Sequence, residues 1–251
     1  IGDGKLLSKL TKKKVIFDFR QNDLKNGGEG APLAPIFHEM LQKKFNIKPL
    51  SFFNIGGILN ITTIWDDGLL AARDLGPGMC LIDKWIRTKT NNEYDKNGDI
   101  AKLGKVNKIV LDKYWNSFQA SNQEQGSFDT NDFDISFAKN LSLKDGAATL
   151  TFNTANYFIS YFKSNKMNKD TFKEKIILCG GGRKNKFLVS TIKSFNKNVK
   201  LIDEYGIDGD FVESQAFGYL AIRSYLGLPI SFPETTGCIK PCTGGVIVKN
   251  Y

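Results

Sequence analysis

The first stretch with the residue types of a chemical site runs from Val15 to Phe37, VIFDFRQNDLKNGGEGAPLAPIF. A short apolar segment, predicted to be a buried strand, leads into Asp18, Arg20 and Asp23. The glycines that follow allow backbone angles that other residues resist, and they let a ligand approach the main chain closely. Two prolines then stiffen the end of the stretch. The combination favours a ligand-binding loop over the alternative of a plain turn with solvated acids.

Three glycine clusters lie farther along the chain: NIGGILN (residues 54–60), DLGPGM (74–79) and CGGGRKN (179–185). None of them matches the phosphate loop G-x-x-x-x-G-K-[ST] or the dinucleotide pattern G-x-G-x-x-G. A GPG before a helix and a GGG after a strand can leave backbone N–H groups that face phosphate or ribose oxygens. Together, on one sheet, the clusters predict a nucleotide site.

Alternating apolar patterns predict the elements that must hold these clusters. Residues 50–57, 58–65 and 69–76 are predicted to be three strands, joined by the turn signals Gly-Gly and Asp-Asp-Gly. Helices are predicted at residues 79–88, 145–163, 185–195 and 210–227, and further strands at 174–182 and 198–203. Residues 91–144 are predicted to be an insertion of short helices. The pattern indicates a mixed α/β sheet with helices on its faces.

The composition disfavours several classes of function. The 251 residues are 41% hydrophobic, enough for a packed core, and no apolar run reaches the roughly 18 residues of a membrane helix. The net charge of +9 comes from lysines interleaved with Asn, Asp and Glu, without a continuous basic stripe, which disfavours nucleic-acid binding. Cys80 and Cys179 are predicted core residues, and a single His leaves Cys238 and Cys242 without a zinc ligand set. Reduced thiols and a cytoplasmic location fit this pattern.

Six segments, taken in order, resemble the family of anhydro-N-acetylmuramic acid kinases: DFRQNDLKNGGEGAPLAPIFH, NIGGILNIT, DLGPGMCLIDKWI, YDKNGDIAKLGKV, ILCGGGRKN and GDFVESQAFGYLAIRSYLGLPISFPETTG. The resemblance runs from Ile1 to the C-terminal region. It implies the actin, hexokinase and heat-shock-70 superfamily, in which two ribonuclease-H-like domains close on ATP and a sugar. The domains expected are the remnant of a first domain at residues 1–48 and a second domain at residues 49–251.

The reaction that the resemblance implies joins hydrolysis to phosphorylation. Water opens the 1,6-anhydro bridge of the amino sugar, and the freed O6 receives the γ-phosphate of ATP, a step of peptidoglycan recycling. The water needs a general base, and the match to the family motif assigns that role to Asp23. Asp18 and Arg20 match as a pair that orients the loop. The residues expected to contact the sugar are Glu29, Gly30 and Glu213.

The same resemblance places the nucleotide at the glycine clusters. NIGG corresponds to the superfamily's second phosphate loop, and CGGGRKN is expected to contact adenosine and ribose. The residues expected to bind nucleotide are Asn54, Gly56, Gly57, Gly76, Gly78, Gly180, Gly181, Gly182 and Asn185. Leu75 and Met79 replace a Thr and an Asn that are usual in the family, so those polar contacts are not carried over. Mg²⁺ is expected with ATP because phosphoryl transfer needs neutralised phosphates, and no metal ligand is assigned.

Several alternatives stay open at this stage. Asp210 and Glu213 have the spacing of a capping box at a helix start, which competes with a substrate role for Glu213. His38 matches a family histidine, although a lone histidine in apolar surroundings is commonly structural. Family members begin with a further Gly-Thr-Ser-rich segment, so the chain is expected to be a fragment or a truncated form. A non-catalytic nucleotide- or sugar-binding module is therefore the alternative function, and a homodimer is kept as one expectation for the assembly.

Overall fold

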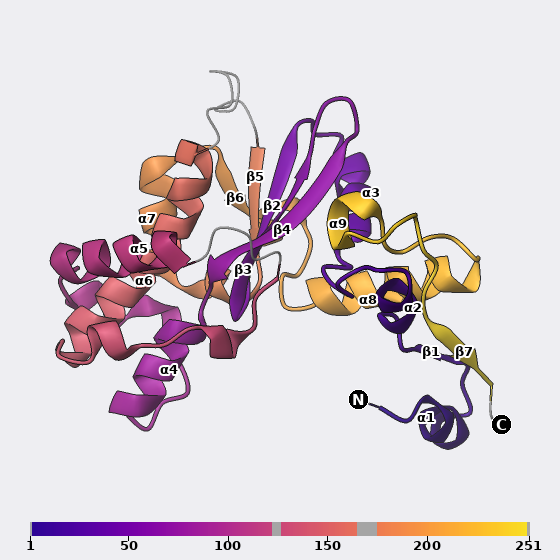
Figure 1. Cartoon of the computed structure of the whole chain (residues 1–251), viewed down its shortest axis with the longest axis horizontal. Coiled ribbons are helices and arrows are strands. Elements are labelled where there is room, and N and C mark those ends of the chain that lie inside the picture. The colour runs from indigo at the N-terminus through magenta and orange to yellow at the C-terminus, as the bar shows by residue number, and fades with distance from the viewer. Residues whose placement is uncertain (1, 122–126, 165–174, 250–251) are drawn as a thin grey trace. The chain divides into compact units, whose positions relative to one another are not determined.

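The structure is a computed structural model that describes residues 2–121, 127–164 and 175–249. The chain divides into two compact units. Unit 1 consists of Ile1–Ile47, Thr62–Ala72 and Phe211–Tyr251, and unit 2 consists of Lys48–Ile61 and Arg73–Asp210. The elements of each unit are labelled in Figure 1.

A five-stranded sheet has the strand order β4-β3-β2-β5-β6 (Figure 1). Its strands are β2 (Leu50–Ile55), β3 (Ile58–Ile64), β4 (Leu70–Pro77), β5 (Lys175–Cys179) and β6 (Val199–Leu201). The two-residue connection between β2 and β3 requires an antiparallel pair, whereas β5 runs parallel to both β2 and β6. The predicted mixed α/β sheet is thus confirmed.

Helices with apolar faces form the core of unit 2, either against this sheet or against the helix that covers it. They are α4 (Cys80–Lys89), α5 (Lys108–Ser121), α6 (Leu143–Ser164) and α7 (Lys186–Phe195). α6 and α7 lie side by side (Figure 1) and share a core with the central strands. The ring centroids of Phe53 in β2 and Phe158 in α6 are 4.5 Å apart, an aromatic contact that adds about 0.5–1.5 kcal/mol to the burial itself.

The predicted insertion contains short helices joined by irregular segments, in the part that the structure describes. It contains α5 and four 3₁₀ turns: η1 (Lys96–Gly98), η2 (Ala101–Leu103), η3 (Thr130–Asp132) and η4 (Ser136–Ala138). Residues 122–126 of the predicted insertion lie outside the described residues. Two further 3₁₀ turns, η6 (Gly181–Lys184) and η7 (Ile202–Tyr205), follow β5 and β6.

Unit 1 is built from both ends of the chain. Its elements are α1 (Gly4–Thr11), β1 (Val15–Phe17), α2 (Gln21–Lys25), α3 (Pro35–Phe45), α8 (Val212–Tyr225), α9 (Pro233–Thr236) and β7 (Val246–Val248). β1 pairs antiparallel with β7, with Val15 opposite Val248. The core that joins α3 to α8 is small and consists of Leu33, Ile36, Leu220 and Ile230.

The observed units divide the chain differently from the predicted domains at its C-terminal end. The first boundary lies between Ile47 and Lys48, next to the predicted one, but Phe211–Tyr251 groups with unit 1. The physical reason is the pairing of β7 with β1 and the packing of α8 on α3. β7 is only three residues long, too short for a local pattern to predict it.

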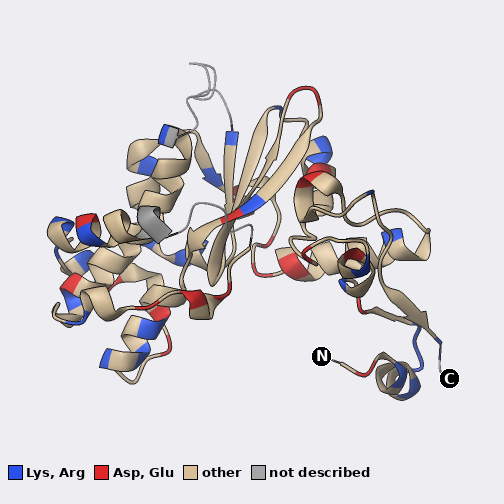
Figure 2. Cartoon of the chain, viewed as in Figure 1, with Lys and Arg blue, Asp and Glu red and all other residues tan. Residues whose placement is uncertain are grey.

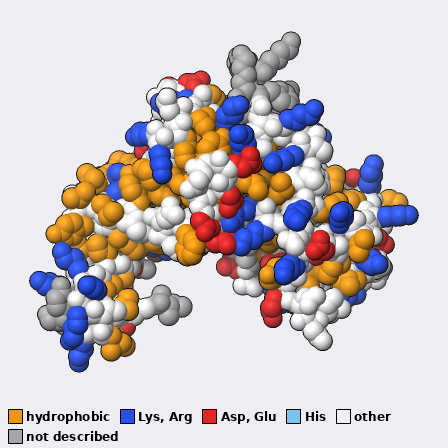
Figure 3. Space-filling model, turned by 180° about the vertical axis from the view of Figure 1, so that it is seen from behind, with side chains coloured by type: hydrophobic (Ala, Val, Ile, Leu, Met, Phe, Trp, Pro, Cys, Tyr) orange, Lys and Arg blue, Asp and Glu red, His pale blue; other side chains and the backbone are white. Residues whose placement is uncertain are grey.

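Exposed apolar side chains gather on unit 1, at the left of Figure 3. Leu10 of α1 is 72% exposed, and Ile239 is 83% exposed. α1 and β1 also line a hollow of about 650 Å³.

Charged side chains are distributed over the helices, with basic and acidic residues interleaved (Figure 2). Within the described ranges, none of the helices has the length and hydrophobicity needed to span a bilayer.

Candidate functional site

Three glycine bends meet at the end of β2, and we call this place the glycine edge: residues 56–57, 76–78 and 180–182. The Gly78 N–H donates to the Gly57 carbonyl at 2.9 Å, which joins the first two bends. Gly180 follows β5, and a Cβ on it would lie 2.6 Å from the Ile55 carbonyl oxygen. The structure therefore brings together the glycines that the sequence assigns to the nucleotide.

The backbone N–H groups of the glycine edge divide into paired and open ones. Those of Gly78, Met79 and Cys80 donate to the carbonyls of residues 56 and 57 at 2.8–3.2 Å. The GPG bend therefore does not present these groups to a ligand, contrary to the prediction. Gly57 and Gly181 are exposed, and in the part of the chain that the structure describes their N–H groups have no acceptor. Amides in this position can bind phosphate oxygens.

Helix α6 fixes the bend around Gly76 and Gly78. The Thr154 hydroxyl donates to the Gly78 carbonyl at 2.6 Å. The Tyr157 ring fills the space that a Cβ on Gly76 would occupy. Leu75, one of the departures from the family pattern, packs against the same core. Met79, the other departure, also contacts this core, so both substitutions place apolar side chains in apolar surroundings.

The two asparagines assigned to the nucleotide have different surroundings. Asn54 is half-buried near the end of β2, and its Oδ1 lies next to Gly180. Asn185 is 3% exposed and caps α7, because its Oδ1 accepts the Leu188 N–H at 2.9 Å. Such a cap stabilises a helix by about 1 kcal/mol. The oxygen of Asn185 is thus used within the protein and not presented to a ribose.

Asp23 is the centre of a buried hydrogen-bond network in unit 1. Its Oδ1 accepts from the Thr236 hydroxyl at 2.7 Å, and its Oδ2 accepts from the Gly30 N–H at 2.7 Å. The residue is 1% exposed. Burial alone would raise the pKa of Asp23, but hydrogen bonds from Ser231, Thr236, the Gly30 N–H and Cys238 outweigh it and hold the pKa below its ordinary value. We call these residues the Asp23 network.

That Asp23 is the general base stays a prediction, and the geometry also gives this residue a structural role. A base must reach the proton that it accepts, directly or through one water, whereas both oxygens of Asp23 bond to groups of unit 1. A lowered pKa also makes a carboxylate a weaker proton acceptor at neutral pH. A Cβ on Gly28 would overlap the carboxylate of Asp23, so the loop of residues 26–30 packs closely against that carboxylate. Asp23 therefore fits a role in holding that loop in place.

The residues assigned to the sugar, Glu29 and Gly30, lie on the loop that the Asp23 network holds. Glu29 is exposed, and its N–H donates to the Thr236 carbonyl at 2.8 Å. Arg20 also contacts this loop, because its Nη1 donates to the Gly30 carbonyl at 2.6 Å. The predicted pair of Asp18 with Arg20 is absent among the described ion pairs. Arg20 thus orients the loop through a bond from its side chain to the loop's backbone carbonyl at Gly30.

Glu213 lies exposed in the first turn of α8 in unit 1. The capping-box alternative for it is wrong, because α8 has no side-chain cap. Asp210, the expected partner in that box, instead pairs with Arg183 and Lys184. The carboxylate of Glu213 is therefore not committed to capping its helix.

His38 is a structural histidine of unit 1. It is 3% exposed, and its Nδ1 lies 2.9 Å from the Thr62 hydroxyl. Burial lowers the pKa of His38 to about 3, so the ring is neutral at physiological pH. A role in proton transfer near neutral pH does not fit this ring.

Asp74 is a carboxylate of the glycine edge to which the sequence analysis gave no role. It lies in β4, two residues before Gly76, and it is half-buried. Its Oδ2 accepts the Phe128 N–H at 2.9 Å, which fixes the direction of the side chain. Its place directly before a glycine bend at a strand end is the signal that could have identified it.

Asp83, in the first turn of α4, carries a carboxylate with a raised pKa. Burial raises the pKa of Asp83 to about 6, although Arg87 lowers it, and the neighbouring Asp95 adds to the rise. Among the described residues its buried Oδ1 has no hydrogen-bond partner. The charged form of Asp83 is thus disfavoured in the folded protein, and a neutral replacement should be tolerated.

We expect Asp83→Asn to stabilise the protein at neutral pH but not at pH 4. The pKa of Asp83 is higher in the folded protein than in the unfolded chain. The stability that the protonated carboxyl contributes to the wild type is therefore lost as the pH rises from about 4 through 6. The amide does not ionise, so the gain should reach on the order of 1–2 kcal/mol above pH 6.5. Urea unfolding at several pH values measures it, with Asp112→Asn on the exposed face of α5 as the control. An equal gain at pH 4 and pH 7.5 would contradict the assignment.

A mixed α/β sheet whose glycine bends gather at one edge is an arrangement in which enzymes bind nucleotides at strand ends. Comparison with known proteins narrows this class. The family model for anhydro-N-acetylmuramic acid kinase matches residues 1–250. The chain therefore belongs to the anhydro-N-acetylmuramic acid kinase family.

Three relatives show the extent of the similarity, and each is described as an anhydro-N-acetylmuramic acid kinase. The protein of Pelagibacter ubique is 50% identical over 258 residues, which cover 100% of this chain and 69% of the relative. The protein of Rhizobium johnstonii is 41% identical and is matched over 67% of its length. The protein of Zymomonas mobilis is also 41% identical, again with 67% of the relative covered. The match extends over both units of the structure.

Proposed function

We propose that the protein opens 1,6-anhydro-N-acetylmuramic acid with water and phosphorylates the freed O6 with ATP. Water adds to the anomeric carbon, the bond between that carbon and O6 breaks, and O6 forms a bond to the γ-phosphorus. The products are N-acetylmuramic acid 6-phosphate and ADP. The match of residues 1–250 to the kinase family carries this proposal.

The distribution of the assigned residues supports it. Every residue that the sequence assigns to the nucleotide lies in unit 2, at or beside the glycine edge. The residues assigned to the sugar, Glu29, Gly30 and Glu213, all lie in unit 1. A reaction between two substrates needs two binding surfaces, and the two units supply one each.

We propose Asp74 as a candidate for the general base beside Asp23, to which the resemblance assigns that role, and we propose that Asp23 also positions its loop. Asp74 is half-buried and fixed by the Phe128 N–H, so its direction is set without complete removal from solvent. A base in this position accepts the proton of the attacking water. Asp23 is sealed inside its network, where it shapes the loop that carries Glu29 and Gly30.

The glycine edge fits a phosphate chain, because the exposed amides of Gly57 and Gly181 can donate to phosphate oxygens. Within the described ranges no group of three His, Cys, Asp or Glu side chains could hold a metal ion. We propose that Mg²⁺ is held chiefly by the phosphates of ATP, where it neutralises their charge. A place in bacterial cell-wall recycling in the cytoplasm follows from this substrate.

The test is a product assay with the protein, ATP, Mg²⁺ and the anhydro sugar. We expect ADP and a sugar 6-phosphate in equal amounts, measured by a coupled ADP assay and by ³¹P NMR. N-acetylmuramic acid without the anhydro bridge is the matched control, since it tests whether ring opening and phosphorylation are coupled. ADP release without sugar phosphate would contradict the proposal. Calorimetric binding of ATP without any turnover would favour the non-catalytic binding module instead.

A further inference from the structure

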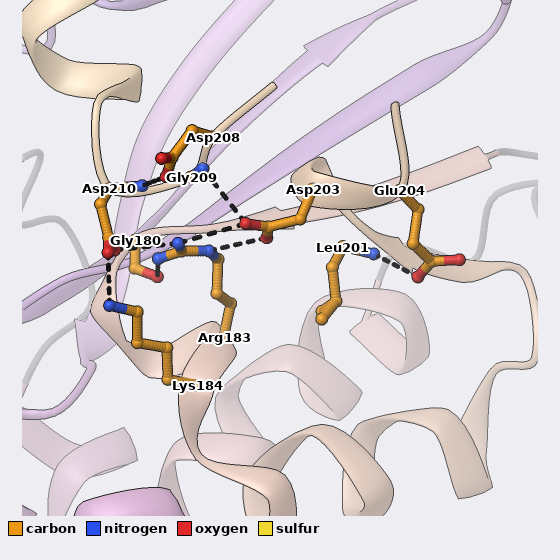
Figure 4. A network of polar contacts seen from close by, with 9 residues as sticks. All are labelled: Gly180, Arg183, Lys184, Leu201, Asp203, Glu204, Asp208, Gly209 and Asp210. Carbon is orange, nitrogen blue, oxygen red and sulfur yellow. Dashed lines mark hydrogen bonds and ion pairs between the residues drawn. The ribbon is translucent and has the colours of Figure 1, made fainter. Parts of the chain in front are cut away.

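An ion network in unit 2 surrounds Arg183, which follows the glycine bend of residues 180–182 (Figure 4). The Arg183 side chain is only 4% exposed. Its Nε donates to Asp203 Oδ2 at 2.9 Å, and its Nη2 donates to Asp210 Oδ1 at 2.9 Å. Its Nη1 donates to the Gly180 carbonyl at 3.1 Å. One guanidinium therefore joins the bend to two carboxylates that come later in the chain.

The segment of residues 208–210 is shaped to receive this guanidinium. A Cβ on Gly209 would overlap the Arg183 guanidinium, and the Gly209 N–H donates to Asp203 Oδ1 at 3.2 Å. Lys184 Nζ adds an ion pair to Asp210 Oδ2 at 2.6 Å. Figure 4 shows Asp203 and Asp210 approaching Arg183 from different sides, Asp203 from η7 and Asp210 from the segment of residues 208–210. A forked guanidinium makes this set of contacts, whereas an ammonium offers a single point of charge.

The contact with Gly180 gives the network its significance for the site. Gly180 has φ +79 and ψ 173, a conformation that is essentially restricted to glycine. Its carbonyl is held by Arg183, and the next residue, Gly181, has an exposed N–H without an acceptor in the described part of the chain. The Gly180 carbonyl and the Gly181 N–H belong to the same planar peptide group, so a bond that fixes the direction of the carbonyl also fixes the direction of the N–H. Loss of the guanidinium would remove one of the two bonds that hold this carbonyl and leave the bond from the Arg183 backbone N–H, at 3.3 Å.

We propose that Arg183 is a positioning residue for nucleotide binding. Its guanidinium is held by Asp203 and Asp210 and donates to the Gly180 carbonyl, which keeps the bend of residues 180–182 in the orientation that binds the nucleotide. This inference rests on the proposed ATP site at the glycine edge. Arg183 does not touch the nucleotide in this role. It acts through the backbone of residues 180–182.

The test measures ATP binding by calorimetry for Arg183→Gln, Arg183→Lys and Lys193→Gln. The last variant removes an exposed ion pair of the same unit, Lys193 with Glu204 at 3.6 Å, and serves as the matched control. We expect Arg183→Gln to raise the Kd for ATP about tenfold or more and Arg183→Lys to recover part of the loss. The control should bind as the unsubstituted protein does. The variants should fold, because Asp203 and Asp210 are 44% and 50% exposed and remain solvated without the arginine.

The outcomes separate this inference from the proposed function. If the unsubstituted protein binds no ATP, the proposed function fails and the inference fails with it. If it binds ATP and Arg183→Gln binds within twofold of it, only the role of Arg183 is overturned. Asp210→Asn provides an independent variant, and its effect should be non-additive with Arg183→Gln, since both act on one contact.

Discussion

Asp74→Asn should reduce the kcat of sugar phosphorylation by about 10²–10⁴-fold and leave the protein folded. The amide retains an oxygen that can accept the Phe128 N–H, so the side chain keeps its direction, but it cannot take the proton of the attacking water. Steady-state ADP release measures the loss, and thermal unfolding shows that stability is retained. Asp66→Asn, at an exposed carboxylate in the turn after β3, is the control. Turnover within threefold of wild type would remove Asp74 from the base role.

Asp23→Asn completes this comparison, because the sequence analysis assigned the base to that residue. Its two oxygens accept from different donors, Thr236 and Gly30. The amide must turn its NH₂ toward either the Thr236 hydroxyl or the Gly30 N–H. Two buried donors then face each other without an acceptor, which costs about 1–3 kcal/mol of stability. We expect a lower Tm and an altered KM for the sugar. An unchanged Tm with complete loss of turnover would restore the base role to Asp23.

Gly180→Ala should have the largest effect on the glycine edge. The backbone at Gly180 has φ +79, which disfavours any Cβ. The added methyl would lie 2.6 Å from both the Ile55 carbonyl oxygen and Asn54 Oδ1, and the former belongs to a central strand that cannot move freely. We expect a loss of about 2–4 kcal/mol in the free energy of unfolding, with ATP binding weakened beyond detection.

The neighbouring residue offers a matched control for this prediction. Gly181 has no positive φ, and a Cβ on it would meet nothing within 4 Å. Gly181→Ala should therefore change stability by less than about 0.5 kcal/mol. Chemical denaturation of both variants gives the comparison. Equal stability of the two variants would show that the contact between Gly180 and β2 is not a constraint.

The sequence predicted the glycine edge better than it predicted the Asp23 network. The bends follow strands whose apolar patterns are local, and neighbouring strand ends necessarily lie together once the sheet forms. The partners of Asp23 are not local. Thr236 does not belong to the motif around Asp23 and lies 213 positions away along the chain. No pattern within a short window shows that Asp23 is sealed from solvent.

The capping box that was one alternative for Glu213 is wrong for a related reason. Asp210 has the right residue type and spacing for a cap, but Arg183 and Lys184 compete for its carboxylate. Charge-assisted contacts with two cations are stronger than a single hydrogen bond to a helix amide. A local rule was overridden by a partner that is 27 positions away in the sequence.

The discontinuity of unit 1 has a consequence for how the chain acquires its structure. Residues 1–47 meet their partners in unit 1 only when Phe211–Tyr251 has been synthesised, and the closing contacts join segments far apart in the sequence, as in the pairing of Val15 with Val248. Such non-local contacts are made slowly, because a long intervening chain must be brought to closure before they give any stability. During synthesis, residues 1–47 thus emerge well before the segment that completes unit 1, and they are among the last residues to reach their native contacts.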